Sequence, residues 1–203
     1  MTRRRRAQGR SIVLLLAFSA CLAACVSDGQ KHAAITEVND VFRRDYEQIL
    51  NEKGTRTYPV DQPKAFAALR NALTRLGMRV ADESPEIGYL NVSAPAPNPL
   101  DAKEWREAAD ADLPKMREIA VKHVGLIGNM LRFEPEGLDI VINATALRAG
   151  SGSEISLTMR MRETAPPKSG MPRREYPPPS AVRMGLDKIW REVDRELRPL
   201  RAG

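Results

Sequence analysis

Cysteine and histidine are scarce in this chain of 203 residues, and their scarcity excludes several kinds of chemistry. Both cysteines, Cys21 and Cys25, lie near the N-terminus, so the rest of the chain has no thiol for a disulfide framework, a cysteine nucleophile or a cysteine-ligated zinc. The only histidines are His32 and His123, and a site that needs two histidines in one cleft is not expected. Without a Gly-x-Ser-x-Gly motif, nothing supports a serine triad on His123. We therefore expect no enzyme and no cofactor.

Aromatic residues make up 5% of the chain, so we expect a mainly aliphatic core. The net charge of +6 comes mostly from the N-terminus and does not describe the rest of the chain. Five of the 32 basic residues are arginines among the first ten positions, which contain no acid. The rest of the chain carries 27 basic and 26 acidic residues, close to neutrality. This balance does not indicate nucleic-acid binding.

The N-terminus has the order of features of a bacterial export signal. The arginine block is followed by an apolar run from Ile12 to about Ala20, which is too short to span a bilayer, since spanning takes about 20 apolar residues. Leu22-Ala23-Ala24-Cys25 then resembles the lipobox of bacterial lipoproteins. That resemblance implies a signal peptide over 1–24, cleavage between Ala24 and Cys25, and a diacylglycerol on the Cys25 thiol. An ordinary signal peptide cut at an Ala-x-Ala site is the alternative, and Cys21 is a weaker candidate acceptor.

The lipoprotein resemblance also implies a location and a class of partner. Several acyl chains anchor a protein stably to a membrane. In Gram-negative lipoproteins, Asp after the lipidated cysteine favours the inner membrane, and here the residue is Val26. We therefore expect an outer-membrane lipoprotein facing the periplasm. Its partners would be the membrane, through the lipid, and an envelope protein.

Hydrophobic periodicity divides the remaining chain into a flexible tether over 25–33 and a single α+β domain over 34–203. The expected helices are 34–52, 63–76 and one that begins at Ser180 and carries an apolar stripe around Trp190. The expected strands are 55–60 at a sheet edge, 78–80, 87–93, 130–133, 138–147 and 155–161, and the last two form an antiparallel hairpin. A helical insertion over 95–125 is expected as two helices, with Pro114 beginning the second.

Part of this pattern is similar to the repeated domains of BamC, a lipoprotein of the outer-membrane β-barrel assembly machinery. The matching stretch is Tyr58-Pro59-Val60, then Ala65 to Val80 with its Leu-Gly-Met step, then Glu83 to Val92. The resemblance implies a helix-grip fold, in which an antiparallel sheet packs against a long C-terminal helix. This chain has room for one such domain where BamC has two.

Three residues outside the signal are candidates for a contact surface. Trp105 lies on a mostly polar helix without an evident stripe, and Arg173 and Arg174 lie in a proline-rich loop. The acids Glu104, Glu107, Asp110 and Asp112 are more simply explained as a solvated helix face than as a catalytic pair. No residue type or spacing predicts a metal site.

Two functions follow from the sequence. The first is a non-catalytic envelope lipoprotein that acts as an interaction or assembly component. The alternative is a ligand- or lipid-binding module with a cavity between the sheet and the C-terminal helix. A cavity of several hundred Å³ there would favour the alternative, and a filled core with an exposed apolar patch would favour a partner.

Overall fold

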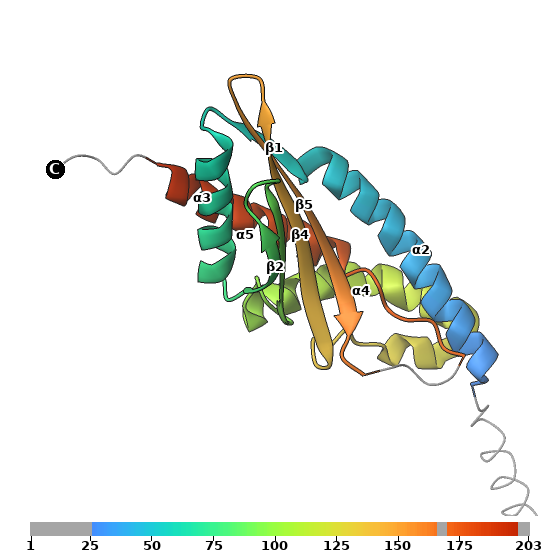
Figure 1. Cartoon of the computed structure of the whole chain (residues 1–203). Helices are drawn as coiled ribbons and strands as arrows, with labels where there is room; N and C mark the ends of the chain where they lie inside the picture. The colour runs from blue at the N-terminus through green and yellow to red at the C-terminus, as the bar shows by residue number, and fades with distance from the viewer. Residues whose placement is uncertain (1–25, 166–169, 199–203) are drawn as a thin grey trace, which may run out of the picture.

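The computed structural model describes residues 26–165 and 170–198, and it confirms the α+β class (Figure 1). The predicted signal peptide and the sites at Ala24 and Cys25 lie outside the described residues. Of the described helices, none has the length and apolar character needed to cross a membrane. The elements in chain order are α2 (Asp28–Lys53), β1 (Thr55–Tyr58), α3 (Gln62–Arg75), β2 (Arg79–Ser84), β3 (Tyr89–Pro95), α4 (Ala102–Val124), the 3₁₀ helix η1 (Gly125–Met130), β4 (Leu138–Ala149), β5 (Gly152–Glu163) and α5 (Pro179–Leu197).

The five strands form one antiparallel sheet in the order β1-β5-β4-β3-β2. The predicted hairpin is confirmed, with Ile140 opposite Met161 and Ile142 opposite Met159. Its strands extend further than expected, so that only a two-residue turn joins Ala149 to Gly152. Gly150 in that turn has φ +57°, a conformation that tight hairpin turns require and that glycine adopts without strain.

One face of the sheet is buried beneath α3 and α5, and the other is lined with polar side chains. The predicted stripe of α5 is confirmed, because Val182, Leu186, Ile189, Trp190 and Val193 are all 0% exposed. The Trp190 Nε1–H donates to the carbonyl of Lys53 at 2.7 Å. The helix approaches β5 closely at Gly185, where a Cβ would come within 3.0 Å of the Met159 sulfur. The space between the sheet and α5 is therefore filled by side chains.

The outer edge of β5 is only partly covered by β1, which pairs with residues 153–156. Three further N–H groups of β5 are satisfied from outside the sheet. The Leu157 N–H donates to the carbonyl of Gly54 at 2.8 Å, that of Met159 to the Tyr46 hydroxyl at 3.2 Å, and that of Met161 to the carbonyl of Glu175 at 3.1 Å. The end of α2 and the segment 171–178 thus close an edge that would otherwise expose unpaired donors.

The first helix begins earlier than the sequence suggested. Residues 28–33, expected as part of a flexible tether, form the first turns of α2. The reason is a capping box, in which the Ser27 hydroxyl accepts from the Gln30 N–H while the Gln30 side chain accepts from the Ser27 N–H. These bonds give partners to N–H groups that the start of a helix would otherwise leave unpaired, and so they stabilise the first turn.

The insertion also differs from expectation, because α4 continues through Pro114 as one helix. Pro114 removes one backbone hydrogen bond. Buried side chains lie both before it, at Trp105 and Ala109, and after it, at Met116 and Ile119, so packing on both sides holds the helix together. Residues 130–133, expected as a strand, instead belong to the end of η1 and an irregular segment.

The last helix begins without the predicted Ser180 cap. Pro177, Pro178 and Pro179 lack N–H groups, so the first free amide of α5 is that of Ser180. Both this N–H and the Ser180 hydroxyl donate to the carboxylate of Asp112 on α4, each at 2.8 Å. Burial raises the pKa of Asp112, although the two bonds from Ser180 act against the rise. Asp112 thereby joins the insertion to the C-terminal helix.

Tyr46→Phe should lower the free energy of unfolding by about 1–3 kcal/mol, because the buried Met159 N–H loses its acceptor while the ring remains. Chemical denaturation measures the loss, and hydrogen exchange should show faster exchange at Met159. Tyr89→Phe is the control, since it lies on the polar face of the sheet and should change stability by less than about 0.5 kcal/mol. Equal effects of the two substitutions would contradict this account of the edge.

Candidate functional site

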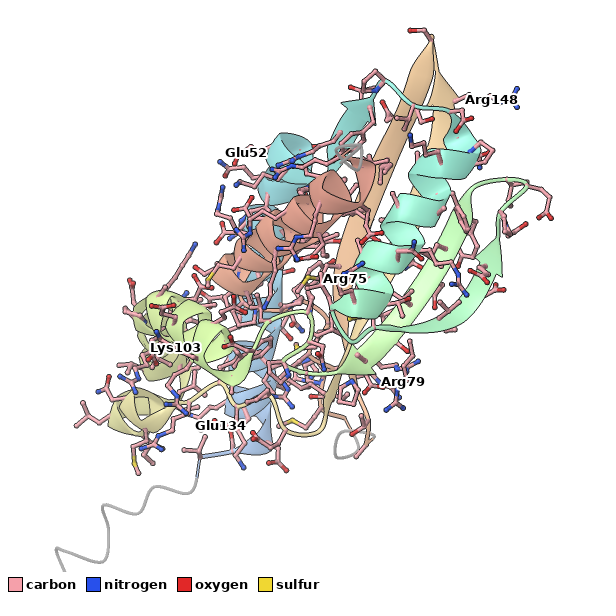
Figure 2. The ribbon with its side chains drawn as sticks, turned by 90° about the vertical axis from the view of Figure 1, so that its left-hand side faces the viewer. Glu52, Arg75, Arg79, Lys103, Glu134 and Arg148 are labelled. Carbon is pink, nitrogen blue, oxygen red and sulfur yellow. The ribbon has the colours of Figure 1, made fainter. Side chains whose placement is uncertain are left out.

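A groove of about 440 Å³ lies between α4 and the irregular segment 131–136. Residues of α4 from Ala102 to Arg117 form one side, and Arg132 to Glu136 form the other. Ala96 and Pro97, from the turn before α4, close one end. Figure 2 shows the region, with Glu134 in the segment below the helix that carries Lys103. We call this feature the α4 groove.

The floor of the α4 groove is apolar. Trp105 and Phe133 meet there with ring centroids 5.9 Å apart, and Ala109 lies beside them. Trp105 is 2% exposed, and its Nε1–H is buried without a hydrogen-bond partner among the described residues. An unpaired buried donor is costly, since such groups are nearly always satisfied in folded proteins.

The rim of the α4 groove carries three arginines and three acids, which are Arg106, Arg117, Arg132, Asp110, Glu134 and Glu136. Within the described part of the chain, none of these six side chains takes part in an ion pair of 4.0 Å or less. Among the described residues, the only side-chain hydrogen bond of the six is that of Arg117, whose Nε donates to the carbonyl of Leu131 at 3.3 Å. The rim therefore offers charges of both signs to a ligand.

The opposite flank of α4 is very different. Lys115 pairs with Asp45 at 2.8 Å, and Lys122 and His123 both contact Glu37, at 2.9 and 2.6 Å. Hydrogen bonds from Lys122 and then His123 lower the pKa of Glu37. These pairs fasten α4 to α2. His123 therefore takes part in a contact between α4 and α2.

The residues predicted as a contact surface are only partly brought together. Trp105 lies in the floor of the α4 groove and is largely buried, so its role as a contact residue stays a prediction. The helix has a stripe after all, since Trp105, Ala109, Met116 and Ile119 are buried together. The Trp105 indole packs against Phe133, and the position of Phe133 could not be inferred from the helical pattern of α4.

The two arginines have different environments. Arg174 is held by Glu163 at 2.6 Å, and its guanidinium lies 5.9 Å from the centre of the Phe133 ring, so it supports the wall of the groove. The ion pair fixes the Arg174 side chain in the fold, and its role as a contact residue stays a prediction. Arg173 is exposed, but it does not line the α4 groove, and its carbonyl accepts a hydrogen bond from the Asn39 side chain at 2.7 Å.

A second cavity of about 120 Å³ lies on the other side of Phe133, between α2 and α4. Its lining is mostly apolar and includes Ile35, Val38, Phe42 and Met116. Neither cavity lies between the sheet and α5, where the sequence-based alternative placed a ligand site.

The chemistry open to the α4 groove follows from the residues that line it. Within residues 26–165 and 170–198, no group of three or more His, Cys, Asp or Glu side chains is arranged to bind a metal ion. Its lining also lacks Ser, Thr, Tyr, Cys and His, so the groove offers charged, apolar and indole groups for binding.

Sequence reasoning missed most of the rim. Arg106, Asp110 and Arg117 recur at helical spacing on α4, so their common face could have been recognised. Glu134 and Glu136 lie in a segment without regular structure, and nothing local indicates that it folds back against α4.

Comparison with known proteins adds no relative: no family model, no curated protein and no solved structure matches this chain. The resemblance to BamC and the lipobox therefore stay predictions from the sequence.

The two tryptophans provide a matched test of the buried indole. Trp190→Phe removes a hydrogen bond to Lys53, whereas Trp105→Phe removes an N–H that has no partner in the described part of the chain. Both lose part of a buried ring, so Trp190→Phe should cost about 1–3 kcal/mol more unfolding free energy. Denaturant unfolding of both variants measures the difference. Similar losses at the two positions would show that Trp105 finds a partner in solution.

Proposed function

We propose that this chain is a non-catalytic lipoprotein of the cell envelope, anchored through Cys25 at the periplasmic face of the outer membrane. Its domain binds an extended segment of a partner protein in the α4 groove. The observation that carries the binding role is the rim of unpaired charges around the apolar floor of Trp105 and Phe133.

A polypeptide suits this arrangement better than a uniformly charged ligand. A rim with three cationic and three anionic side chains is matched by a ligand that carries both signs, as peptide segments commonly do. An apolar side chain of the same segment can cover Trp105 and Phe133. Aromatic residues and arginine are enriched in protein interfaces, and here they lie next to one another.

The ligand-binding alternative has weaker support. The space between the sheet and α5 is filled, and the mostly apolar cavity between α2 and α4 holds about 120 Å³. Small-molecule sites usually have about 300–1,000 Å³. The α4 groove reaches that range, so a small molecule with both charges is the competing occupant, and the test below separates it from a peptide.

The groove can be tested by photo-crosslinking in living cells. A photoreactive amino acid placed at Arg106 or Glu136 should crosslink the full chain to the same peptide of one envelope protein, because these positions line one groove. Position Arg148, near the tip of the β4–β5 hairpin, is the control and should give no such product (Figure 2). Mass spectrometry of the products identifies the crosslinked peptide.

Charge reversal makes the crosslinking test specific. Arg132→Glu should lower the crosslinking yield by about tenfold, as expected if one ionic contact worth roughly 1.4 kcal/mol is replaced by repulsion. Arg148→Glu should leave the yield unchanged. A bound small molecule in the native mass spectrum, with crosslinks independent of Arg132, would favour the alternative function.

The anchor has its own test. Cys25→Ala should abolish palmitate incorporation and leave the precursor at its uncleaved mass, because the thiol is the proposed acyl acceptor. Cys21→Ala should leave both lipidation and cleavage intact. Palmitate that persists on the Cys25 variant would show that the lipobox interpretation is wrong, whatever occupies the groove.

A further inference from the structure

Three large apolar side chains are exposed together on the short helix that follows α4. In η1, Leu126 is 82% exposed, Ile127 is 52% exposed and Met130 is 79% exposed. Ile127 and Met130 are three residues apart, a spacing that stacks side chains on one side of a 3₁₀ helix. We call these three residues the apolar tip. All three lie within five residues of one short helix, whereas single exposed apolar side chains are ordinary on protein surfaces.

The apolar tip is a fixed feature of the fold. Gly128 packs against the backbone of α4 so closely that a Cβ would lie 2.5 Å from the Val121 nitrogen and 2.6 Å from the Ala120 carbonyl carbon. Gly125 precedes it at φ +66° and allows the chain to turn back. With Gly128 as its inner side, η1 directs Leu126, Ile127 and Met130 away from α4.

The helix η1, which carries the apolar tip, lies at the end of the molecule where α2 begins, as both views show (Figures 1 and 2). Contacts of Lys122 and His123 with Glu37 tie the end of α4 to α2 just before η1 starts. Glu37 is nine residues into α2, or roughly 14 Å along its axis. Cys25 lies three residues before Asp28 and can reach roughly 10 Å from it.

We propose that the apolar tip inserts into the headgroup region of the membrane beside the lipid anchor, as a second point of attachment. This inference rests on the proposed anchoring at Cys25. One attachment leaves a domain free to tumble, and two attachments at the same end restrict its orientation. An apolar surface gains free energy by leaving water for this region, as interfacial helices do.

The sequence around the apolar tip fits a lipid surface. No charged residue occurs from Val124 to Leu131. An uncharged apolar segment can enter the interface without the cost of desolvating a charge. The proposed lipid on Cys25 would also hold the membrane close to this end of the domain.

Site-directed fluorescence tests the insertion. The full chain is produced with Cys21→Ser and either Ile127→Cys or Ile87→Cys, labelled with an environment-sensitive dye, and reconstituted into vesicles of phosphatidylethanolamine and phosphatidylglycerol. Ile87 is the matched control, since it is 66% exposed but lies in the turn between β2 and β3. The chain without a new cysteine reports any dye taken up by Cys25 itself.

Insertion predicts a blue-shifted dye at position 127 that nitroxide-labelled acyl chains quench, and a dye at position 87 that they do not quench. Leu126→Ser with Met130→Ser should lower the quenching several-fold, and circular dichroism should show an unchanged fold. A dye at 127 that stays in water would overturn the inference. A blue shift without lipid quenching would also overturn it, because a protein surface then covers the tip. Acyl groups in the mass spectrum of the same sample test the anchor separately.

Discussion

The uncovered edge of β5 is the constraint on which the arrangement of the helices depends. β1 is too short to pair with the whole strand, so the N–H groups of Leu157, Met159 and Met161 need acceptors from elsewhere. Tyr46 supplies the central acceptor from α2. Burial of this side chain raises the pKa of Tyr46. The Arg160 guanidinium on β5 lies 4.7 Å from the centre of the Tyr46 ring. This cation–π contact adds to the attachment of α2 to the strand.

Once α2 lies along that edge, it determines where α4 can lie. The ion pairs of Asp45 with Lys115 and of Glu37 with Lys122 follow the length of α2, and Asp112 ties α4 to α5 in addition. Each pair is partly exposed, so each contributes modestly, but together they fix one flank of α4 against the domain. On the other flank, the charged side chains of the groove rim have no ion pair among the described residues, and the α4 groove lies there above the buried Trp105 and Ala109.

The sequence predicted those parts of the fold that depend on local periodicity. The alternation of Ile155, Leu157 and Met159 predicted the hairpin, and the stripe around Trp190 predicted the C-terminal helix on the sheet. Long-range contacts were not predictable in this way. Tyr46 looks like one more apolar residue of a helical stripe, yet its hydroxyl closes a strand edge. The burial of Trp105 depends on Phe133, whose segment has no period from which its path could be inferred.

The proposed binding surface and the proposed membrane contact lie on one continuous piece of structure. The groove residues of α4 run from Ala102 to Arg117, and η1 begins at Gly125, directly after the helix ends. At 1.5 Å per residue, the groove lies roughly 12–34 Å along the axis from the start of η1. If the apolar tip enters the membrane, a partner segment in the groove is bound at most this far from the membrane surface, and this limit is reached when α4 stands perpendicular to the membrane. A tilted α4 brings the groove nearer to the lipid, so the orientation set by two attachments would decide which partner segments can reach it.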